Sequence, residues 1–223
     1  MSILTVEDLR FSYDGERQIL NGVSFTAEAG EALVLAGWSG CGKSTLCRCL
    51  CGVIPQSAEG VFSGSVTADG CAVSAAPLSE SAQHIGMVFQ NPDDMLVCST
   101  VEDELAFGLE NLCVPPAEIR ARVDEYLARF SLGGLALRDP ATLSGGQKKL
   151  VSIAAALIMG PKILILDEPM TGLDAPSRDL VRTAVTELLQ GGCTVVAVEH
   201  DLAMAGYARR ILYLREGRLY DQP

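Results

Sequence analysis

The sequence has few positive charges, few aromatic residues and no long hydrophobic run. Its 223 residues include 17 Lys and Arg against 28 Asp and Glu, which gives a net charge of −11. This deficit argues against a surface that binds nucleic acid or anionic lipid head groups. Aromatic residues make up 5% of the chain, whereas hydrophobic residues together make up 48%. That content is enough for a sizeable core in one globular domain.

The sequence also shows no pattern typical of a membrane span or of a secretory leader. The longest apolar run, residues 150–159, falls well short of the roughly 20 residues that a bilayer needs. Residues 1–8 are acidic, and no basic stretch precedes an apolar one, so a secretory signal is not expected. We therefore expect a chain that spans no membrane and stays in the cytoplasm.

The eight cysteines show no paired CxxC spacing and have no neighbouring His residues. The tightest group is Cys47, Cys49 and Cys51, and a helix would place only Cys47 and Cys51 on one face. A three-thiolate metal site would need a strand or loop there. Small buried thiols in a reducing compartment are the better interpretation.

Continuous apolar runs predict the main sheet, at residues 32–36, 163–166 and 194–198. Unbroken runs of this length are typical of strands buried on both faces of a parallel sheet. Helical patterns follow the runs, at residues 44–50, 177–189 and 202–209. The alternation indicates an α/β fold with a mostly parallel core sheet and flanking helices.

An antiparallel β-subdomain is predicted beside this sheet. The first thirty residues and residues 61–73 are short alternating segments. They are broken by the turn pairs Asp14-Gly15, Asn21-Gly22 and Asp69-Gly70.

The segment of about 91–159 is helical in pattern. Thr100 with Asp103 resembles a capping box, Pro115-Pro116 lies at the start of a helix over 117–130, and Ser144 opens another helix. We therefore expect one domain, residues 1–223, with an inserted helical subdomain over about 91–159.

A phosphate-binding loop is the strongest motif. Residues 37–45 contain the pattern G-x-x-x-x-G-K-[ST], directly after a predicted strand and before a predicted helix. The glycines let backbone N–H groups wrap phosphates, Lys43 neutralises the β- and γ-phosphates, and the Ser44 hydroxyl can ligate Mg²⁺. We predict a nucleoside triphosphate site made by Gly37, Trp38, Ser39, Gly40, Cys41, Gly42, Lys43, Ser44 and Thr45.

Two carboxylates follow the apolar run 163–166. Asp167 and Glu168 would lie at the carboxyl end of a parallel strand, where such sheets collect their ligands. We predict Asp167 as a Mg²⁺ partner and Glu168 as the general base that polarises the attacking water. Without the phosphate loop, a solvated acidic turn would be the better interpretation.

A second helix start suited to anions follows Leu143. Ser144, Gly145, Gly146 and Gln147 precede a predicted helix, so a hydroxyl and backbone N–H groups point out of its N-terminus. Ordinary N-capping by Ser144 is the alternative. Together with the two preceding motifs, this segment resembles the signature of the ABC transporter ATPase family.

The resemblance covers essentially the whole chain and implies a P-loop NTPase of the ABC ATPase type that hydrolyses ATP with Mg²⁺. Tyr13 matches the aromatic residue that stacks on adenine, with an edge-strand tyrosine as the alternative. Gln90 matches the glutamine that senses Mg²⁺ and the attacking water. His200 matches the switch histidine at the γ-phosphate.

The resemblance also implies a dimer. Ser144, Gly145 and Gly146 would bind the γ-phosphate held by the phosphate loop of a second ATPase subunit, in a head-to-tail homodimer or heterodimer. Leu173-Asp174 matches the loop that contacts the opposing subunit. Trp38 departs from the family, which has a smaller residue there, and we expect the ring either to perturb the dimer face or to shield the nucleotide.

Two features indicate which branch of the family the sequence resembles: the spacing between two motifs, and a local sequence match. Ser44 and Leu143 are 99 positions apart, too few for the long coiled coil of the chromosome-maintenance and DNA-repair relatives. Residues 89–94 and 100–112 resemble the ATPases of energy-coupling factor importers, which take up vitamins or cobalt and nickel. Another ABC transporter branch, or a non-catalytic ATP-dependent dimerisation switch, is the alternative.

That resemblance implies a membrane partner. Asp93 and Asp94 fall where the family presents acidic groups to basic residues on the coupling helices of a transmembrane subunit. Helix capping by the two aspartates is the alternative. The chain would then be a peripheral protein at the cytoplasmic face of the cell membrane, without a span of its own.

Overall fold

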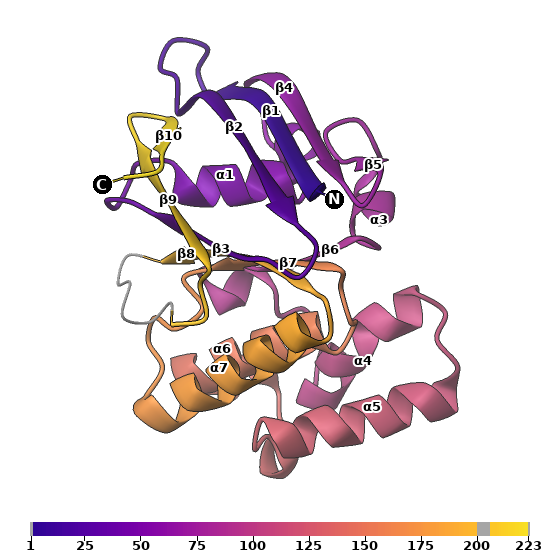
Figure 1. The fold of residues 1–223 in the computed structure, drawn as a ribbon. Helices are drawn as coiled ribbons and strands as arrows, with labels where there is room; N and C mark the ends of the chain where they lie inside the picture. Colours follow the sequence, from indigo (N-terminus) through magenta and orange to yellow (C-terminus); the bar gives the residue numbers. More distant parts are fainter. Residues whose placement is uncertain (1, 200–205, 223) are drawn as a thin grey trace. The chain divides into compact units, whose positions relative to one another are not determined.

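The three apolar runs form the centre of a six-stranded sheet in a computed structural model of the chain (Figure 1). The strand order is β10 (Arg218–Tyr220), β9 (Arg210–Arg215), β3, β8, β7 and β6 (Ile85–Val88). Strand β3 (Ala32–Ala36) pairs in parallel with β8 (Thr194–Glu199), and β8 pairs in parallel with β7 (Ile163–Asp167). Every residue of these three strands is buried. The α/β fold class and the positions of its central strands are therefore confirmed.

The structure describes residues 2–199 and 206–222. The chain divides into two compact units. Unit 1 comprises Met1–Met87, Pro161–Glu168 and Thr186–Pro223. Unit 2 comprises Val88–Gly160 and Pro169–Val185.

A four-stranded antiparallel sheet completes the strands of unit 1, in the order β2-β1-β4-β5. Its strands are β1 (Ser2–Ser12), β2 (Leu20–Glu28), β4 (Val61–Ala68) and β5 (Cys71–Ala72). Asp14-Gly15 lies between β1 and β2, and Asp69-Gly70 joins β4 to β5, as predicted.

The turn predicted at Asn21-Gly22 is wrong, because both residues lie inside β2. Leu9 pairs with Val23 and Arg10 pairs with Asn21, so Gly22 is an extra residue in the ladder. Its φ of +80° is a conformation that favours glycine, and it serves a β-bulge rather than a hairpin turn.

Helix α1 (Lys43–Leu50) contributes to the core of unit 1. Its side chains Leu46 and Leu50 belong to one buried cluster with strand residues such as Leu33 and Ile165. Each fully buried leucine side chain stabilises the fold by about 1.5–3 kcal/mol. The core therefore holds α1, and with it the end of the preceding loop, against the strands of unit 1.

The cysteine group lies on α1 and at its C-cap. Burial raises the pKa of the Cys49 thiol to about 12, and burial, with Asp167 next, raises that of Cys47 well above its usual value. All eight cysteines are described and none forms a disulfide. Residues 2–199 and 206–222 contain no group of three side chains placed to hold a metal ion.

The smaller elements of unit 1 connect its strands. They are α2 (Val53–Gln56), α3 (Leu78–Ser81), β6 (Ile85–Val88, which ends in unit 2), β9 (Arg210–Arg215) and β10 (Arg218–Tyr220). The helix predicted over 202–209 is not confirmed where it can be seen. Residues 206–209 form a turn and bend that lead into β9, and residues 202–205 lie outside the described part of the chain.

Unit 2 is built from helices whose starts follow the predicted signals. Its elements are η1 (Pro92–Asp94), α4 (Val101–Asn111), α5 (Pro116–Arg129), η2 (Gly133–Leu135), η3 (Pro140–Thr142) and α6 (Gly145–Leu157). The Thr100 hydroxyl accepts a hydrogen bond from Asp103 N at 3.2 Å and caps α4. Pro116 is the first residue of α5.

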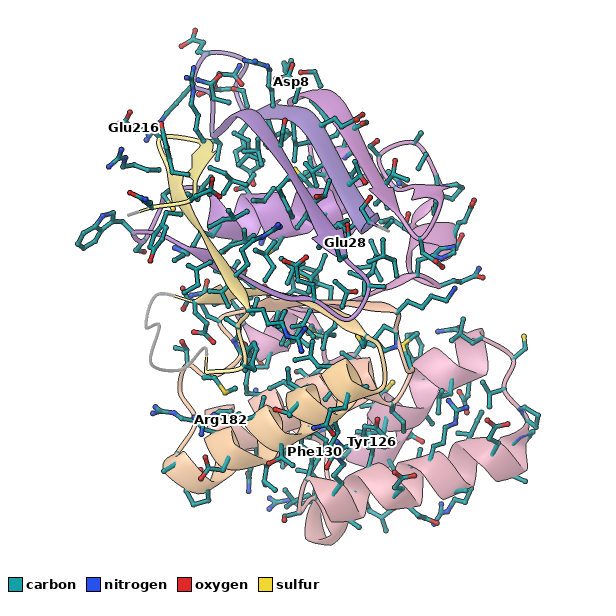
Figure 2. All side chains as sticks on the ribbon, in the orientation of Figure 1. Asp8, Glu28, Tyr126, Phe130, Arg182 and Glu216 are labelled. Atoms are coloured by element: carbon teal, nitrogen blue, oxygen red, sulfur yellow. The ribbon has the colours of Figure 1, made fainter. Side chains whose placement is uncertain are left out.

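The tyrosine Tyr126 ties α5 to α6 within unit 2. Its hydroxyl donates to Leu157 O at 3.1 Å, and its ring stacks on Phe130, with the ring centroids 6.1 Å apart. Both aromatic residues are labelled in Figure 2. Helix α7 (Ala175–Gln190) begins in unit 2 and ends in unit 1. Across the described residues, no helix combines the length and the apolar character needed to cross a membrane.

Candidate functional site

The carboxyl ends of the parallel strands of unit 1 meet at one edge of the main sheet. Strand β3 ends at Ala36, just before the phosphate loop, and Ala36 is in register with Glu199 on β8. On the other side of β8, Val198 is in register with Asp167, the last residue of β7. The structure therefore places the phosphate loop and the acidic pair at the same edge, where parallel sheets form their sites.

The phosphate loop follows a path that glycine makes possible. Gly37, Gly40 and Gly42 have φ values of +155°, +78° and +105°, which residues with a side chain rarely adopt. A Cβ atom on Gly37 would also lie 2.5 Å from Leu214 O. The backbone of the loop can thus turn tightly and face a ligand directly.

Lys43 folds back over this loop. Its Nζ donates to Gly37 O at 2.8 Å and to Trp38 O at 2.9 Å, and the side chain is only 5% exposed. Burying an ammonium group is costly unless polar groups meet it. The loop carbonyls provide that compensation and hold the positive charge inside the loop, where a phosphate would be bound.

The N-terminus of α1 is open to a ligand. Its N-cap, Gly42, is in the left-handed conformation, and no described side chain caps the helix. The first backbone N–H groups of a helix have no partner within the helix and carry partial positive charge. Ser44 and Thr45 lie in this first turn, so hydroxyl groups and N–H groups converge there.

Two aromatic side chains lie at the phosphate loop. The Tyr13 hydroxyl lies 3.3 Å from Thr45 Oγ1, and its ring meets Phe11 edge to face. Tyr13 follows the end of β1 and is 45% exposed, so it lies beside the loop rather than on a distant strand edge. Trp38 is 83% exposed.

The acidic pair combines a buried and a half-buried carboxylate. Asp167 is 2% exposed, and its charge contributes, after burial, to the raised pKa of Cys47 on α1. Glu168 has a φ of +48°, uncommon for a residue with a side chain, and its N–H donates to Val198 O at 3.1 Å. Asp167 and the Ser44 hydroxyl are hard oxygen donors of the kind that Mg²⁺ prefers, so the residues present fit a magnesium nucleotide.

Gln90, in unit 2, lies just after β6 and is exposed. The backbone carbonyl oxygen of Gln90 accepts a hydrogen bond from Lys149 Nζ at 2.8 Å, and the same Nζ donates to the backbone carbonyl oxygen of Phe89 at 2.9 Å. Lys149 is a residue that the sequence patterns did not point to. The available signal was one lysine at the start of a run of helical residues that are otherwise almost all apolar.

The signature segment begins α6 with a complete capping box. Ser144 Oγ accepts from Gln147 N at 3.3 Å, and Gln147 Oε1 accepts from Ser144 N at 3.0 Å. The capping role offered as the alternative for Ser144 is therefore present. Ser144 and Gly145 are nevertheless exposed, and a Cβ atom on Gly145 would meet open space, so the helix end stays accessible to an anion.

Asp93 and Asp94 do not cap a helix, which is the alternative role predicted for them. Asn91 caps η1, since its side chain accepts from Asp93 N at 3.3 Å and donates to Asp94 Oδ1 at 3.1 Å. Asp93 instead forms an ion pair with Lys148 at 2.6 Å and stays 60% exposed.

Asp174 and His200 are two further residues that the sequence predicts for the site. Asp174 accepts a hydrogen bond from Ser177, which lowers the pKa of its carboxyl group. His200 lies outside the described residues. Unit 1 thus brings together Tyr13, residues 37–45, Asp167 and Glu168, whereas Gln90 and residues 144–147 belong to unit 2.

The sequence matches one known family over most of its length. The profile of the family described as ABC transporter matches residues 20–171. The energy-coupling factor transporter ATP-binding protein EcfA1 of Levilactobacillus brevis is 40% identical over 99% of this chain and 78% of its own length. The cobalt import ATP-binding protein CbiO of Syntrophus aciditrophicus is 39% identical over 99% of this chain and 79% of its own length.

Some relatives are much longer than this chain. A protein of Methanosarcina mazei named as an ABC transporter ATP-binding protein is 39% identical over 100% of this chain, yet the chain spans only 39% of that relative.

Solved structures show the same fold. The structure of cbiO1 from Clostridium perfringens, part of the ABC transporter complex cbiONQ, is 34% identical with a TM-score of 0.81, over 98% of this chain and 87% of that one. A dimeric post-hydrolysis state of an ATP-binding cassette with ADP and Pi is 27% identical with a TM-score of 0.86, over 97% of this chain and 96% of that one.

Proposed function

The chain belongs to the ATP-binding subunits of the ABC transporter family, in their energy-coupling factor branch, and on that premise we propose that its ATP hydrolysis powers uptake of a vitamin, cobalt or nickel. One observation carries the catalytic part of this proposal. The loop that buries the Lys43 ammonium and the pair Asp167-Glu168 lie at the same edge of one mostly parallel sheet.

Binding begins at the phosphate loop. Lys43 Nζ, held by the carbonyls of Gly37 and Trp38, would neutralise β- and γ-phosphate oxygens while the loop N–H groups surround them. Tyr13 would stack on the adenine ring. Bound Mg²⁺ would offset phosphate charge, with Ser44, Asp167 and Gln90 as its protein partners.

Hydrolysis would depend on Glu168. The oxygen of a water molecule forms a bond to the γ-phosphorus, Glu168 takes the water proton, and the bond from that phosphorus to the ADP oxygen breaks. The hydrogen bond from Glu168 N to Val198 O and the positive φ fix the direction in which this side chain leaves the backbone. Gln90 would orient the water, and His200 would contact the γ-phosphate.

The signature segment would complete the site of a second ATPase subunit. Ser144, Gly145 and Gly146 would bind the γ-phosphate held by the opposing phosphate loop, in a head-to-tail dimer. The exposed end of α6 supports this role, and so does the likeness to a dimeric cassette with ADP and Pi.

A transmembrane subunit would hold the complex at the cytoplasmic face of the membrane. Asp93 and Asp94 of η1 would bind basic residues of that subunit. The Asp93 side chain stays 60% exposed despite its pair with Lys148, which leaves it accessible to such a partner.

Affinity purification from membranes tests the assembly. The tagged chain should retain an integral membrane protein and a second ATPase subunit. The double variant Asp93→Lys, Asp94→Lys should lose the membrane partner because like charges would face each other. Asp179→Lys is the matched control, since it reverses another exposed carboxylate of unit 2. Recovery of the wild type without any membrane protein, or equal recovery by the double variant, would contradict the assigned contact.

A further inference from the structure

Helix α6 carries a positive charge on its buried face. Residues 149–154 are all buried, and Lys149 is only 3% exposed. An ammonium group is rarely buried in a core unless polar atoms surround it. The position of Lys149 therefore has to be explained by the groups that its Nζ meets.

Those groups are the two carbonyls on either side of the Gln90 Cα atom. Lys149 Nζ donates to Phe89 O at 2.9 Å and to Gln90 O at 2.8 Å. Peptide groups are planar, so only φ and ψ of Gln90 set the relation between these two planes. One atom that binds both carbonyls consequently fixes the backbone of Gln90 and the direction of its Cα–Cβ bond.

The loop that begins at Phe89 and Gln90 and runs to Cys98 is also held at other points within unit 2. Phe89 N lies 3.3 Å from Met95 Sδ. Near its other end, the buried Glu104 of α4 accepts from Val97 N at 2.9 Å and from Cys98 N at 2.8 Å. A buried cation from α6 and a buried anion from α4 thus brace the loop from opposite ends.

We propose that Lys149 is a positioning residue that orients Gln90 for hydrolysis and links it to the signature helix. This inference rests on the proposed function. Lys149 lies about one turn after the exposed helix start at Ser144, so any displacement of α6 by a phosphate at that end moves the Nζ atom and the Gln90 backbone together.

Steady-state kinetics of the full chain separates positioning from binding. Lys149→Met should lower kcat by roughly 10- to 100-fold, because a misplacement of about 1 Å has effects of that size, while the KM for ATP stays within about twofold. Lys149→Arg should recover most of kcat, since its donors can still reach carbonyl oxygens. Lys162→Met, which removes an exposed lysine of unit 1, is the control and should behave as wild type.

A double-mutant cycle with Gln90→Ala tests whether Lys149 acts through Gln90. In that background, Lys149→Met should lower kcat by no more than about twofold. Losses that multiply independently would overturn the proposal, as would an unchanged kcat in Lys149→Met alone.

Folding is checked by thermal unfolding followed by circular dichroism. If Lys149→Met unfolds, Lys149→Gln, which keeps a donor, replaces it in the same cycle with the same expected coupling. Absence of hydrolysis by the wild type would contradict the proposed function itself. Wild-type hydrolysis that is insensitive to Lys149 would contradict only the positioning role.

Discussion

Two helix starts, one in each unit, are suited to bind an anion, yet they are built differently. At α1, Gly42 is the N-cap, no described side chain caps the helix, and the buried Lys43 ammonium lies beside it. At α6, Ser144 and Gln147 cap each other. The first helix start leaves its donors for a ligand, whereas the second satisfies part of its own.

We infer from this difference that the start of α1 serves ATP binding and the start of α6 serves closure of a dimer. The start of α1 combines backbone N–H groups, hydroxyl groups and a full positive charge, so we expect it to hold a triphosphate by itself. The start of α6 offers a weaker partial charge and is stable without a ligand. We infer that unit 1 determines the affinity for ATP, and that the signature of unit 2 contributes when two subunits meet.

The largest expected effect is on turnover. Glu168→Gln keeps the shape of the side chain but removes its capacity to take a proton, so kcat should fall by about 10²–10⁴-fold. Affinity for ATP should stay within about twofold. Phosphate release and an equilibrium ATP titration measure the two quantities, and wild-type turnover by this variant would remove Glu168 from the role of base.

The next largest effect is on the affinity for ATP, and it distinguishes the role of unit 1 from that of unit 2. Lys43→Ala should weaken ATP binding by about 10- to 100-fold, the equivalent of one charge-assisted hydrogen bond of about 1.5–3 kcal/mol. Lys148→Ala, which removes a lysine of α6, should leave ATP affinity unchanged in the same titration. Equal losses in the two variants would contradict the assignment of affinity to unit 1.

A pair of cap variants tests the second helix start. Ser144→Ala and Thr100→Ala each remove a helix N-cap in unit 2, so each should lower the free energy of unfolding by about 1 kcal/mol. Only Ser144→Ala should also slow phosphate release. Urea unfolding and phosphate release are measured on both proteins, and an equal slowing would mean that Ser144 acts as a cap alone.

The smallest expected effect lies in unit 1, away from the site. Lys162 Nζ lies 2.7 Å from Asp69 Oδ2 and His84 Nδ1 lies 3.0 Å from it, and the hydrogen bond from Lys162 is the main reason that the pKa of Asp69 is lowered. A lowered pKa adds stability above the unfolded value of about 3.9, and this is lost as pH falls through the folded value.

Asp69→Asn should therefore lower the free energy of unfolding at pH 7 by less than about 1 kcal/mol. Denaturant unfolding as a function of pH should show this difference shrinking in acid, below the unfolded pKa. A difference that is constant with pH would mean that the ion pairs are not its source.

Much of unit 1 could be predicted because its signals are local. An unbroken apolar run specifies a buried strand, and the phosphate-loop motif specifies the turn and helix that follow it. The turn predicted at Asn21-Gly22 was wrong because the same glycine conformation occurs in a hairpin turn and in a β-bulge. Which of the two forms depends on how the segment pairs with β1.

The missed part of the site depends on contacts that no local pattern encodes. Lys149 meets the carbonyls of Phe89 and Gln90, which are 60 and 59 positions away in the sequence. Only the packing of unit 2 brings these groups together. The roles given to the site residues all stay predictions, and His200 lies outside the described residues.

Phosphate release by the wild-type chain with ATP and Mg²⁺ tests most directly whether this site is a catalyst. We predict saturable release whose half-saturation shifts in Lys43→Ala and which nearly disappears in Glu168→Gln. ATP binding by the wild type with phosphate release no faster than that of Glu168→Gln, both alone and with its membrane partners, would contradict hydrolysis. That result would leave a nucleotide-dependent dimerisation switch in its place.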